Sequence, residues 1–259
     1  MSAVLDDEIR GSRRIVSVMG TVFSVDVRDL ALDSEAVDRV VGWWRWVDAT
    51  FSTYRSDSQV VELGDGRRGL EDCAVEVRDV LALCRDATEA SDGYFTAEPG
   101  GRLDPTGLVK GWSVEVASRM LHGAGSRVHC IAAGGDLRSS GSPAPGRPWR
   151  LGVVDPFDRT RVAAVVVGHD LAVATSGTAE RGPHIVDPVR RRPATELASV
   201  TLVGADLTHV DAMATAVFAM GERCRTWLAR RPDLGALVVG ADGRAWVQQP
   251  CAGARIEVC

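Results

Sequence analysis

Three segments of the sequence combine oxygen ligands, glycines and a lysine at spacings that could hold a phosphate and a cation. In residues 103–111 (LDPTGLVKG), Asp104 precedes a predicted helix whose first turn holds Lys110. Backbone N–H groups at the start of a helix attract phosphate, and a lysine there adds a positive point charge. The segment lacks the GxxxxGK[ST] order of a P-loop, so a capped helix without a ligand remains the alternative.

The second segment, residues 210–221 (VDAMATAVFAMG), places Asp211 and Thr215 four residues apart on a predicted helix. This spacing stacks the two side chains on one face of the helix. Carboxylate and hydroxyl oxygens are ligands that a hard cation such as Mg²⁺ prefers. Alternatively, Asp211 interacts with the helix dipole and the Thr215 hydroxyl bonds to its own backbone.

The third segment, residues 132–136 (AAGGD), has paired glycines at the end of an apolar strand, where they permit close approach of a ligand. It is followed by residues 174–177 (ATSG) and by residues 184–188 (HIVDP). His184 lies in a predicted turn, where a histidine can equally be a structural or surface residue. Asp187-Pro188 is an ordinary turn signal.

These segments must be positioned by helices that come early in the chain and by strands that come mostly later. Residues 15–27 alternate as a strand does, and we expect Gly20 to mark a bulge or a close backbone approach within it. Without strict βαβ alternation, the order predicts an α+β fold with a mixed or antiparallel sheet and packed helices. The other predicted elements are helices over 35–50, 75–90, 108–121, 210–220 and 223–230, strands over 128–132, 150–154, 162–167, 171–175 and 199–203, and a hairpin of 237–239 with 245–247.

We predict one domain over residues 1–259, with a core of about 18–247. Residues 1–14 and 250–259 are predicted to be loose termini, and residues 139–148 (SSGSPAPGRP) a surface loop.

Composition excludes several classes of protein. The 45% hydrophobic and 25% charged residues are typical of a globular protein. A net charge of −5 argues against broad nucleic-acid binding. No apolar run approaches the roughly 18 residues of a membrane span. Residues 1–14 contain neither an apolar signal core nor a cysteine for a lipid anchor, so we expect a cytoplasmic protein. The six scattered cysteines show no zinc-ligand spacing, and we expect them to be reduced thiols.

Lys110 is the only lysine among 30 basic residues. Arginine stands at every other basic position, which indicates GC-rich coding and has no functional meaning by itself.

The order of the motifs closely resembles the FAD:protein FMN transferase family (the ApbE family). The resemblance covers roughly residues 18–247. The motifs are Met19-Gly20-Thr21, Phe51-Ser52-Thr53-Tyr54, Leu103-Asp104 with Lys110-Gly111, Gly134-Gly135-Asp136, Thr175-Ser176-Gly177, His184-Ile185 with Asp187-Pro188, and Asp211-Ala212 with Ala214-Thr215-Ala216.

The resemblance implies an α+β fold similar to the tunnelling fold, with FAD between the sheet and the helices. It implies an enzyme that uses Mg²⁺ to cleave the pyrophosphate of FAD, transfers FMN through a phosphoester to a Thr or Ser of a partner protein, and releases AMP. By motif position, Asp211 and Thr215 would be metal ligands, together with the backbone carbonyl of Gly107. The residues that would contact FAD are Met19, Tyr54, Tyr94, Phe95, Asp104, Lys110 and Ile185.

His184 falls on the histidine of the HI-x-DP motif. Because histidine titrates near neutral pH, we expect it to be the base that activates the acceptor hydroxyl. Lys110 could hold phosphate oxygens. The chain departs from the family pattern at Thr96, at Thr178 and at Val189-Arg190.

Two alternative functions remain open from the sequence. The same metal could activate water, which would make the protein an FAD pyrophosphatase yielding FMN and AMP. A non-catalytic flavin-binding module is the other alternative, but it would not need the cation ligands Asp211 and Thr215.

Overall fold

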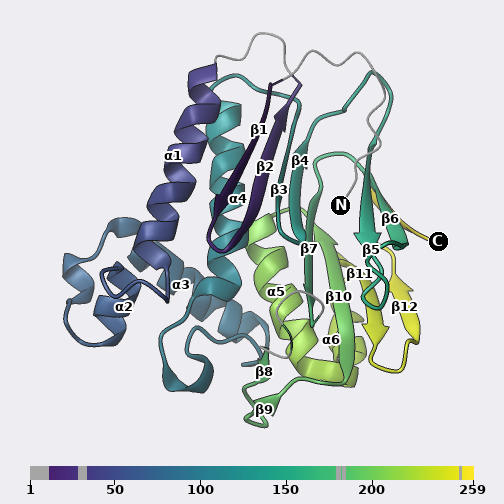
Figure 1. The fold of residues 1–259 in the computed structure, drawn as a ribbon. Coiled ribbons are helices and arrows are strands. Elements are labelled where there is room, and N and C mark those ends of the chain that lie inside the picture. The colour runs from purple at the N-terminus through teal and green to yellow at the C-terminus, as the bar shows by residue number, and fades with distance from the viewer. Residues whose placement is uncertain (1–11, 29–33, 179–181, 183–184, 251–252) are drawn as a thin grey trace.

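An antiparallel sheet runs through the middle of the molecule, with helices on one face and a smaller sheet on the other (Figure 1). The computed structural model describes residues 12–28, 34–178, 182, 185–250 and 253–259. The large sheet has the strand order β1-β2-β3-β4-β7-β10-β11-β12, and the small sheet has the order β13-β6-β5. Every strand pairing within the described residues is antiparallel, which confirms the predicted α+β class.

The strands are β1 (Ser12–Val18), β2 (Thr21–Val27), β3 (His129–Ala133), β4 (Asp136–Ser140), β5 (Trp149–Val154), β6 (Val162–Gly168), β7 (Ala172–Gly177), β8 (Val186–Asp187), β9 (Arg192–Pro193), β10 (Leu197–Gly204), β11 (Gly235–Gly240), β12 (Ala245–Gln248) and β13 (Ala254–Val258). The helices are α1 (Ser34–Phe51), α2 (Gln59–Gly64), α3 (Val75–Ala90), α4 (Thr106–Gly123), α5 (Leu207–Met220) and α6 (Cys224–Leu228), with short 3₁₀ turns η1 (Leu70–Asp72), η2 (Pro99–Gly101) and η3 (Gly221–Arg223).

The large sheet contributes side chains to two hydrophobic cores, one on each face, because successive residues of a strand point to opposite faces. In β11, Ala236 and Val238 belong to the core under the helices, whereas Leu237 and Val239 belong to the core under the small sheet. Successive side chains of a strand point to opposite faces, so a strand that is apolar throughout indicates burial on both sides. This is why β10 (LASVTLVG) is buried along almost its whole length.

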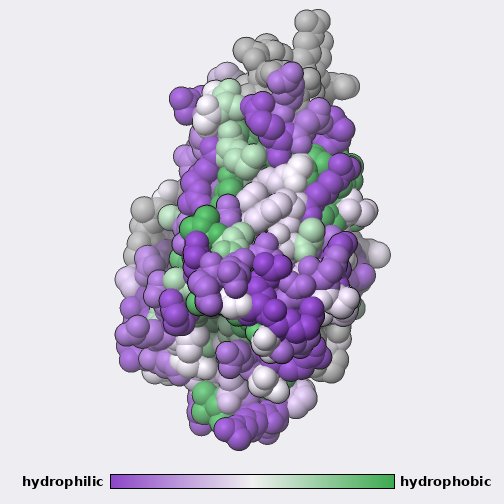
Figure 2. Space-filling model, turned by 90° about the vertical axis from the view of Figure 1, so that its left-hand side faces the viewer, coloured by the Kyte–Doolittle hydropathy of each residue, from purple (hydrophilic) through white to green (hydrophobic). Residues whose placement is uncertain are grey.

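Helices α4 and α5 lie against the large sheet and against each other. Nearly all of α5 is buried, as expected for a helix whose residues are mostly Ala, Val and Met. The close crossing requires a glycine, because a Cβ at Gly111 would stand 2.6 Å from both the Cβ of Asp211 and the carbonyl oxygen of Leu207. Helix α1 covers α4, and its outer side contributes to a predominantly hydrophilic face (Figure 2).

The structure corrects the sequence prediction at the N-terminal strand. Residues 15–27 form the hairpin β1–β2 rather than one interrupted strand, and β1 already begins at Ser12, inside the predicted loose terminus. Met19 and Gly20 have φ values of 50° and 70°, which fits a two-residue turn between the strands. Gly20 therefore marks a turn and not a bulge.

The prediction of a loose C-terminus was also wrong. Residues 254–258 form β13, which pairs with β6 from Ala254↔Gly168 to Val258↔Ala164. The predicted surface loop begins later than expected, because Ser139 and Ser140 are buried in β4. Both errors have one cause: the local sequence does not reveal that a strand elsewhere in the chain supplies the backbone partners of these residues.

The predicted helices and the β11–β12 hairpin are confirmed, with shifted ends. Helix α4 begins at Thr106 and α5 at Leu207, so Lys110 and Asp211 each stand fifth in their helix. Lys110 is therefore in the second turn and not in the first. Among the described helices, none is long and apolar enough to cross a membrane.

Candidate functional site

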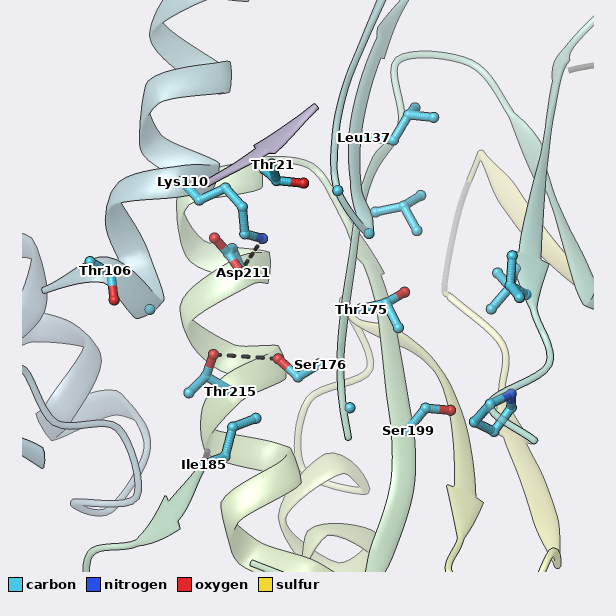
Figure 3. A pocket seen from close by; sticks show the side chains of 18 of the residues that line it. Thr21, Thr106, Lys110, Leu137, Thr175, Ser176, Ile185, Ser199, Asp211 and Thr215 are labelled. Carbon is cyan, nitrogen blue, oxygen red and sulfur yellow. Dashed lines mark hydrogen bonds and ion pairs between the residues drawn. The ribbon is translucent and has the colours of Figure 1, made fainter. Parts of the chain in front are cut away.

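A cavity of about 520 Å³ opens where the helices, the large sheet and the small sheet meet (Figure 3). Its volume lies in the range of small-molecule and cofactor sites. The beginning of α4 and one face of α5 line it on one side. The β3–β4 turn, the end of β7 and strand β5 line it on the other. The cavity thus reaches both faces of the large sheet.

Such a cavity can form because β4 pairs with β7 over only two positions, Leu137↔Val173 and Arg138↔Ala172. Beyond them β7 continues to Gly177, while the chain before β4 reverses direction at Gly134 and Gly135 without forming further strand pairs with β7. A Cβ at Gly135 would stand 3.2 Å from the carbonyl oxygen of Thr175, so this turn packs closely beside β7. The close neighbour of this turn is thus β7, and the predicted close approach of a ligand to the paired glycines stays a prediction.

Lys110 lies between two carboxylates at the centre of the site. Its ammonium forms an ion pair with Asp136 and a second contact of 3.3 Å with Asp211 Oδ1. Burial alone would lower the pKa of Lys110, but the two carboxylates outweigh it and raise that pKa. Burial, together with the neighbouring Asp211 carboxylate, raises the pKa of Asp136 to about 7, against the opposing effect of Lys110. Because its own pKa is raised, Lys110 is a protonated cation at neutral pH.

The structure brings together the three residues that the sequence resemblance assigned to a metal. Asp211, Thr215 and Gly107 all line the cavity. Gly107 is next to Thr215, since a Cβ built on Gly107 would be 3.7 Å from Thr215 Oγ1. The hydroxyl oxygens of Thr215 and Ser176 are 3.4 Å apart, and Figure 3 shows Ser176 facing Thr215 from β7. Asp211 is 4% exposed, and its Oδ2 accepts a hydrogen bond of 2.8 Å from the N–H of Gly111.

Asp104 prepares the start of α4. Its Oδ1 accepts a hydrogen bond of 3.0 Å from the N–H of Thr106 and another from the Thr106 hydroxyl, and its own N–H donates to Ala97 at 2.7 Å. Asp104, Thr106 and Gly107 line the cavity. The first turn of α4 thus faces the cavity, where a helix N-terminus favours an anionic group.

Three of the predicted FAD contacts form an aromatic and aliphatic part of the wall. Tyr94, Phe95 and Ile185 line the cavity. The N–H of Phe95 donates to Ser91 Oγ at 2.8 Å, and Tyr94 Oη accepts from Arg223 at 3.0 Å. Arg223 had no predicted role, and its sequence offers no signal because it stands among several arginines of a predicted helix.

Two predicted residues, Met19 and Tyr54, do not line the cavity. Met19 is part of the β1–β2 turn and packs against the main core, while its neighbour Thr21 reaches the cavity. Tyr54 is 98% exposed after the end of α1. His184 lies outside the residues that the structure describes. The roles of Met19, Tyr54 and His184 stay predictions.

Sequence reasoning missed one whole wall of the site. The consecutive residues 151–155 of β5 and the turn after it line the cavity. Side chains of a strand alternate between faces, so a consecutive run indicates that the strand presents its edge. Gly152 and the turn signal Asp155-Pro156 stand in this segment, but only its tertiary position brings it to the site. The sequence prediction included Asp136 in a motif but gave it no role. The burial of Asp136 points to a role, but burial cannot be deduced from the local sequence.

The fold and the site together define a class: an antiparallel α+β protein whose cavity joins a helix N-terminus, a lysine and an Asp–Thr pair suited to a phosphorylated ligand and a cation. The chain belongs to the ApbE family, whose profile matches residues 96–238. It is 29% identical over 244 residues to an FAD:protein FMN transferase of Rhodobacter capsulatus, covering 89% of this chain and 44% of that protein. It is 32% identical over 169 residues to an FAD:protein FMN transferase of Treponema pallidum, covering 57% of this chain and 46% of that protein. The chain thus spans about half the length of these curated relatives or slightly less.

Solved structures share the fold. The crystal structure of the ApbE protein of Thermotoga maritima superimposes with a TM-score of 0.82 at 22% identity, covering 92% of this chain and 96% of that one. The flavin transferase ApbE of Vibrio cholerae gives a TM-score of 0.78 at 20% identity, with 92% and 97% covered. The predicted resemblance to the ApbE family is confirmed, as is the match of its α+β fold.

Proposed function

We propose that this protein is a Mg²⁺-dependent flavin transferase, which cleaves FAD and attaches FMN to a Thr or Ser hydroxyl of a partner protein. The observation that carries the proposal is the meeting of Lys110, Asp211, Thr215 and the first turn of α4 around one cavity. Relatives named FAD:protein FMN transferase support the choice of FAD as substrate and of a protein as acceptor.

The donors at the cavity fit Mg²⁺. In a regular helix the N–H of Gly111 would donate to the carbonyl of Gly107, but here it donates to Asp211 Oδ2 at 2.8 Å. Because this N–H is directed to Asp211, the carbonyl oxygen of Gly107 has a lone pair with which it would bind a cation beside Thr215. The described residues contain no group of three or more His, Cys, Asp or Glu side chains that could hold a metal alone. Mg²⁺ suits such a site because it keeps waters and takes substrate phosphates as further ligands.

The reaction breaks the phosphoanhydride bond of FAD and forms a phosphoester bond to the acceptor. The acceptor hydroxyl oxygen forms a bond to the phosphorus of the FMN half of FAD, and the bond from that phosphorus to the bridging oxygen breaks. AMP leaves with the bridging oxygen, and the hydroxyl proton passes to a base. A bound Mg²⁺ would supply charge neutralisation on the pyrophosphate.

The chain's own residues would position the pyrophosphate. Lys110 would hold a phosphate oxygen, and the positive end of the α4 dipole would attract the negative charge of the pyrophosphate. Tyr94, Phe95 and Ile185 would contact the apolar parts of FAD. The role of base falls to His184 on sequence grounds alone, because this residue lies outside the described part of the chain.

The fate of FMN distinguishes the proposal from its two alternatives. The protein is incubated with FAD and MgCl₂, with and without acceptor proteins that carry an Asp-Gly…Thr segment and are encoded by neighbouring genes. Free FMN, AMP and acceptor-bound flavin are then quantified by chromatography. A transferase releases AMP in step with acceptor-bound flavin, and the acceptor accelerates AMP release.

AMP and free FMN formed at a rate that no acceptor increases would instead identify a pyrophosphatase. FAD that binds and stays intact with Mg²⁺ and every acceptor would identify a binding module. Either result overturns the proposal.

A further inference from the structure

Asp136 is a buried carboxylate for which the proposed chemistry has no use. It is 0% exposed at the start of β4 and is not among the residues that line the cavity. A buried charge is costly unless it is paired. Asp136 therefore needs a partner that stabilises its charge. Because it does not line the cavity, it would influence a bound ligand through that partner.

The contacts of Asp136 show which neighbour that is. One of its oxygens pairs with the Lys110 ammonium, and Oδ1 accepts a hydrogen bond of 3.3 Å from the N–H of Thr175 in β7. The carboxylate thus joins α4 to the sheet at the point where β4 stops pairing with β7. Lys110 reaches the cavity and is 22% exposed, whereas Asp136 stays behind it.

Lys110 also contacts Asp211, and this creates a competition. Asp211 Oδ2 accepts a fixed backbone N–H from Gly111, so a cation would meet less competition from the backbone at Oδ1. The same Oδ1 receives Lys110 at 3.3 Å. An ammonium with Asp211 as its only anionic partner would move onto that oxygen and compete with Mg²⁺ for it.

We propose that Asp136 is a positioning residue that draws the Lys110 ammonium toward itself and limits it to the 3.3 Å contact with Asp211 Oδ1, so that Asp211 stays available to Mg²⁺. The inference rests on the proposed function, because it assumes that Asp211 is a metal ligand. It also gives the Gly-Gly-Asp segment a definite role, since this segment places an anion behind the only lysine of the chain.

The single lysine makes the proposal directly measurable. Protein labelled with ¹³C and ¹⁵N at lysine gives one side-chain ammonium environment, that of Lys110, in an NMR spectrum. MgCl₂ is titrated into the wild type and into Asp136→Asn, and binding is followed in parallel by calorimetry. Asparagine keeps an oxygen that can accept from Thr175 but removes the charge that retains Lys110.

In the wild type we expect a small, saturable change of the Lys110 signal, because the ammonium stays on Asp136. In Asp136→Asn we expect about 10-fold weaker Mg²⁺ binding and a large change of the signal as Mg²⁺ displaces Lys110 from Asp211. Asp26→Asn is the matched control, since Asp26 is paired with Arg28 and lies outside the cavity lining. It should bind Mg²⁺ as the wild type does.

The double variant Asp136→Asn/Lys110→Met removes both charges of the buried pair, so it keeps the test valid if Asp136→Asn does not fold. With no ammonium to compete, it should bind Mg²⁺ at least as tightly as the wild type. Wild-type binding and an unchanged Lys110 response in Asp136→Asn would overturn the inference alone. A double variant that binds Mg²⁺ more weakly than the wild type would overturn it too. A wild type that binds no Mg²⁺, either alone or with FAD present, would instead remove the proposed function, and the inference with it.

Discussion

At the scale of single residues, Lys110 connects the composition of the chain to its site. It is the only lysine in a sequence that otherwise uses arginine, and it lies between Asp136 and Asp211 at the edge of the cavity. An ammonium is a compact point charge, whereas a guanidinium is planar and larger. The narrow position between two buried carboxylates therefore favours lysine for a physical reason.

We predict that Lys110→Arg lowers kcat/KM for FAD by about 10-fold or more, because the guanidinium cannot hold both carboxylates and still present a charge to the phosphates. Steady-state flavin transfer measures this. Arg119→Lys, an exposed change on the same helix α4, is the control and should leave transfer unchanged. Normal transfer by Lys110→Arg would mean that the site accepts either cation.

Residues that share an element could be predicted from the sequence, and residues that meet across elements could not. Asp211 and Thr215 were predicted to share a face because helical spacing alone brings them together. The pairing of Lys110 with Asp136 depends on α4 crossing the end of β4, which no local pattern encodes. A motif predicts that Tyr54 contacts FAD, and the structure leaves this residue exposed and outside the cavity lining, so its role stays a prediction.

At the scale of elements, the crossing of α4 and α5 sets the geometry of the site. We predict that Gly111→Ala lowers the free energy of unfolding by about 1–3 kcal/mol, because its Cβ would stand 2.6 Å from atoms of Asp211 and Leu207. It should also disturb the hydrogen bond from Gly111 to Asp211. Urea unfolding of the variant measures the loss.

The matched control for that crossing is Gly42→Ala in α1. A Cβ at Gly42 meets nothing within 4 Å, so alanine should be neutral or stabilise the helix by up to about 1 kcal/mol. Equal effects at Gly42 and Gly111 would show that helix propensity, and not close packing, explains the glycine at the crossing.

The β8–β9 hairpin, which follows Ile185, is held by Glu196. This carboxylate accepts a hydrogen bond from the N–H of Glu222 at 3.1 Å and pairs with Arg190 at 2.8 Å and Arg192 at 3.2 Å. The N–H of Glu222 and then Arg190 lower the pKa of Glu196 below its ordinary 4.5, against an opposing effect of burial. The ionised form therefore stabilises the fold above pH 4.5, and this contribution is lost as the pH falls through the lowered pKa.

We predict that Glu196→Gln destabilises the protein by no more than about 1 kcal/mol at neutral pH, because the carboxylate is one-third exposed. The difference from the wild type should narrow as the pH falls below about 4. Urea unfolding across this pH range measures it, with Glu89→Gln on the exposed side of α3 as control. A difference that stays constant with pH would show that the charge of Glu196 contributes nothing.

A helix or strand could be predicted from the sequence where a local residue pattern marks it. The helices were found because apolar residues recur at helical spacing. The β1–β2 turn was misjudged because Met19 adopts a positive φ that non-glycine residues rarely take. Strand β13 was missed because its backbone partners lie in β6, far away in the sequence.

At the scale of the whole molecule, the site depends on two cores that share one sheet. The core under the small sheet includes Trp149 and Val153 of β5 and Ile256 of β13. Because β5 lines the cavity, the small sheet must stay in place for the cavity to keep its wall. The last strand of the chain is thus part of the support of the site.

We predict that Ile256→Ala lowers the free energy of unfolding by about 2–4 kcal/mol, since Ile256 is 4% exposed in that core. Val258→Ala on the same strand should change it little, because Val258 is 62% exposed. Thermal and urea unfolding compare the two variants. Equal and small losses would mean that β13 does not contribute to the fold in solution.

The central claim is that Asp211 holds the cation with which this chain transfers FMN to a protein hydroxyl. It is tested most directly by the intact mass of an acceptor protein after incubation with FAD, MgCl₂ and either the wild type or Asp211→Asn. With the wild type we predict a mass gain equal to one FMN phosphoester, and we predict its loss when a chelator removes Mg²⁺. With Asp211→Asn the rate should be lower by at least about 100-fold. An acceptor that gains this mass equally well with Asp211→Asn, or no gain on any acceptor with the wild type, would contradict the central claim.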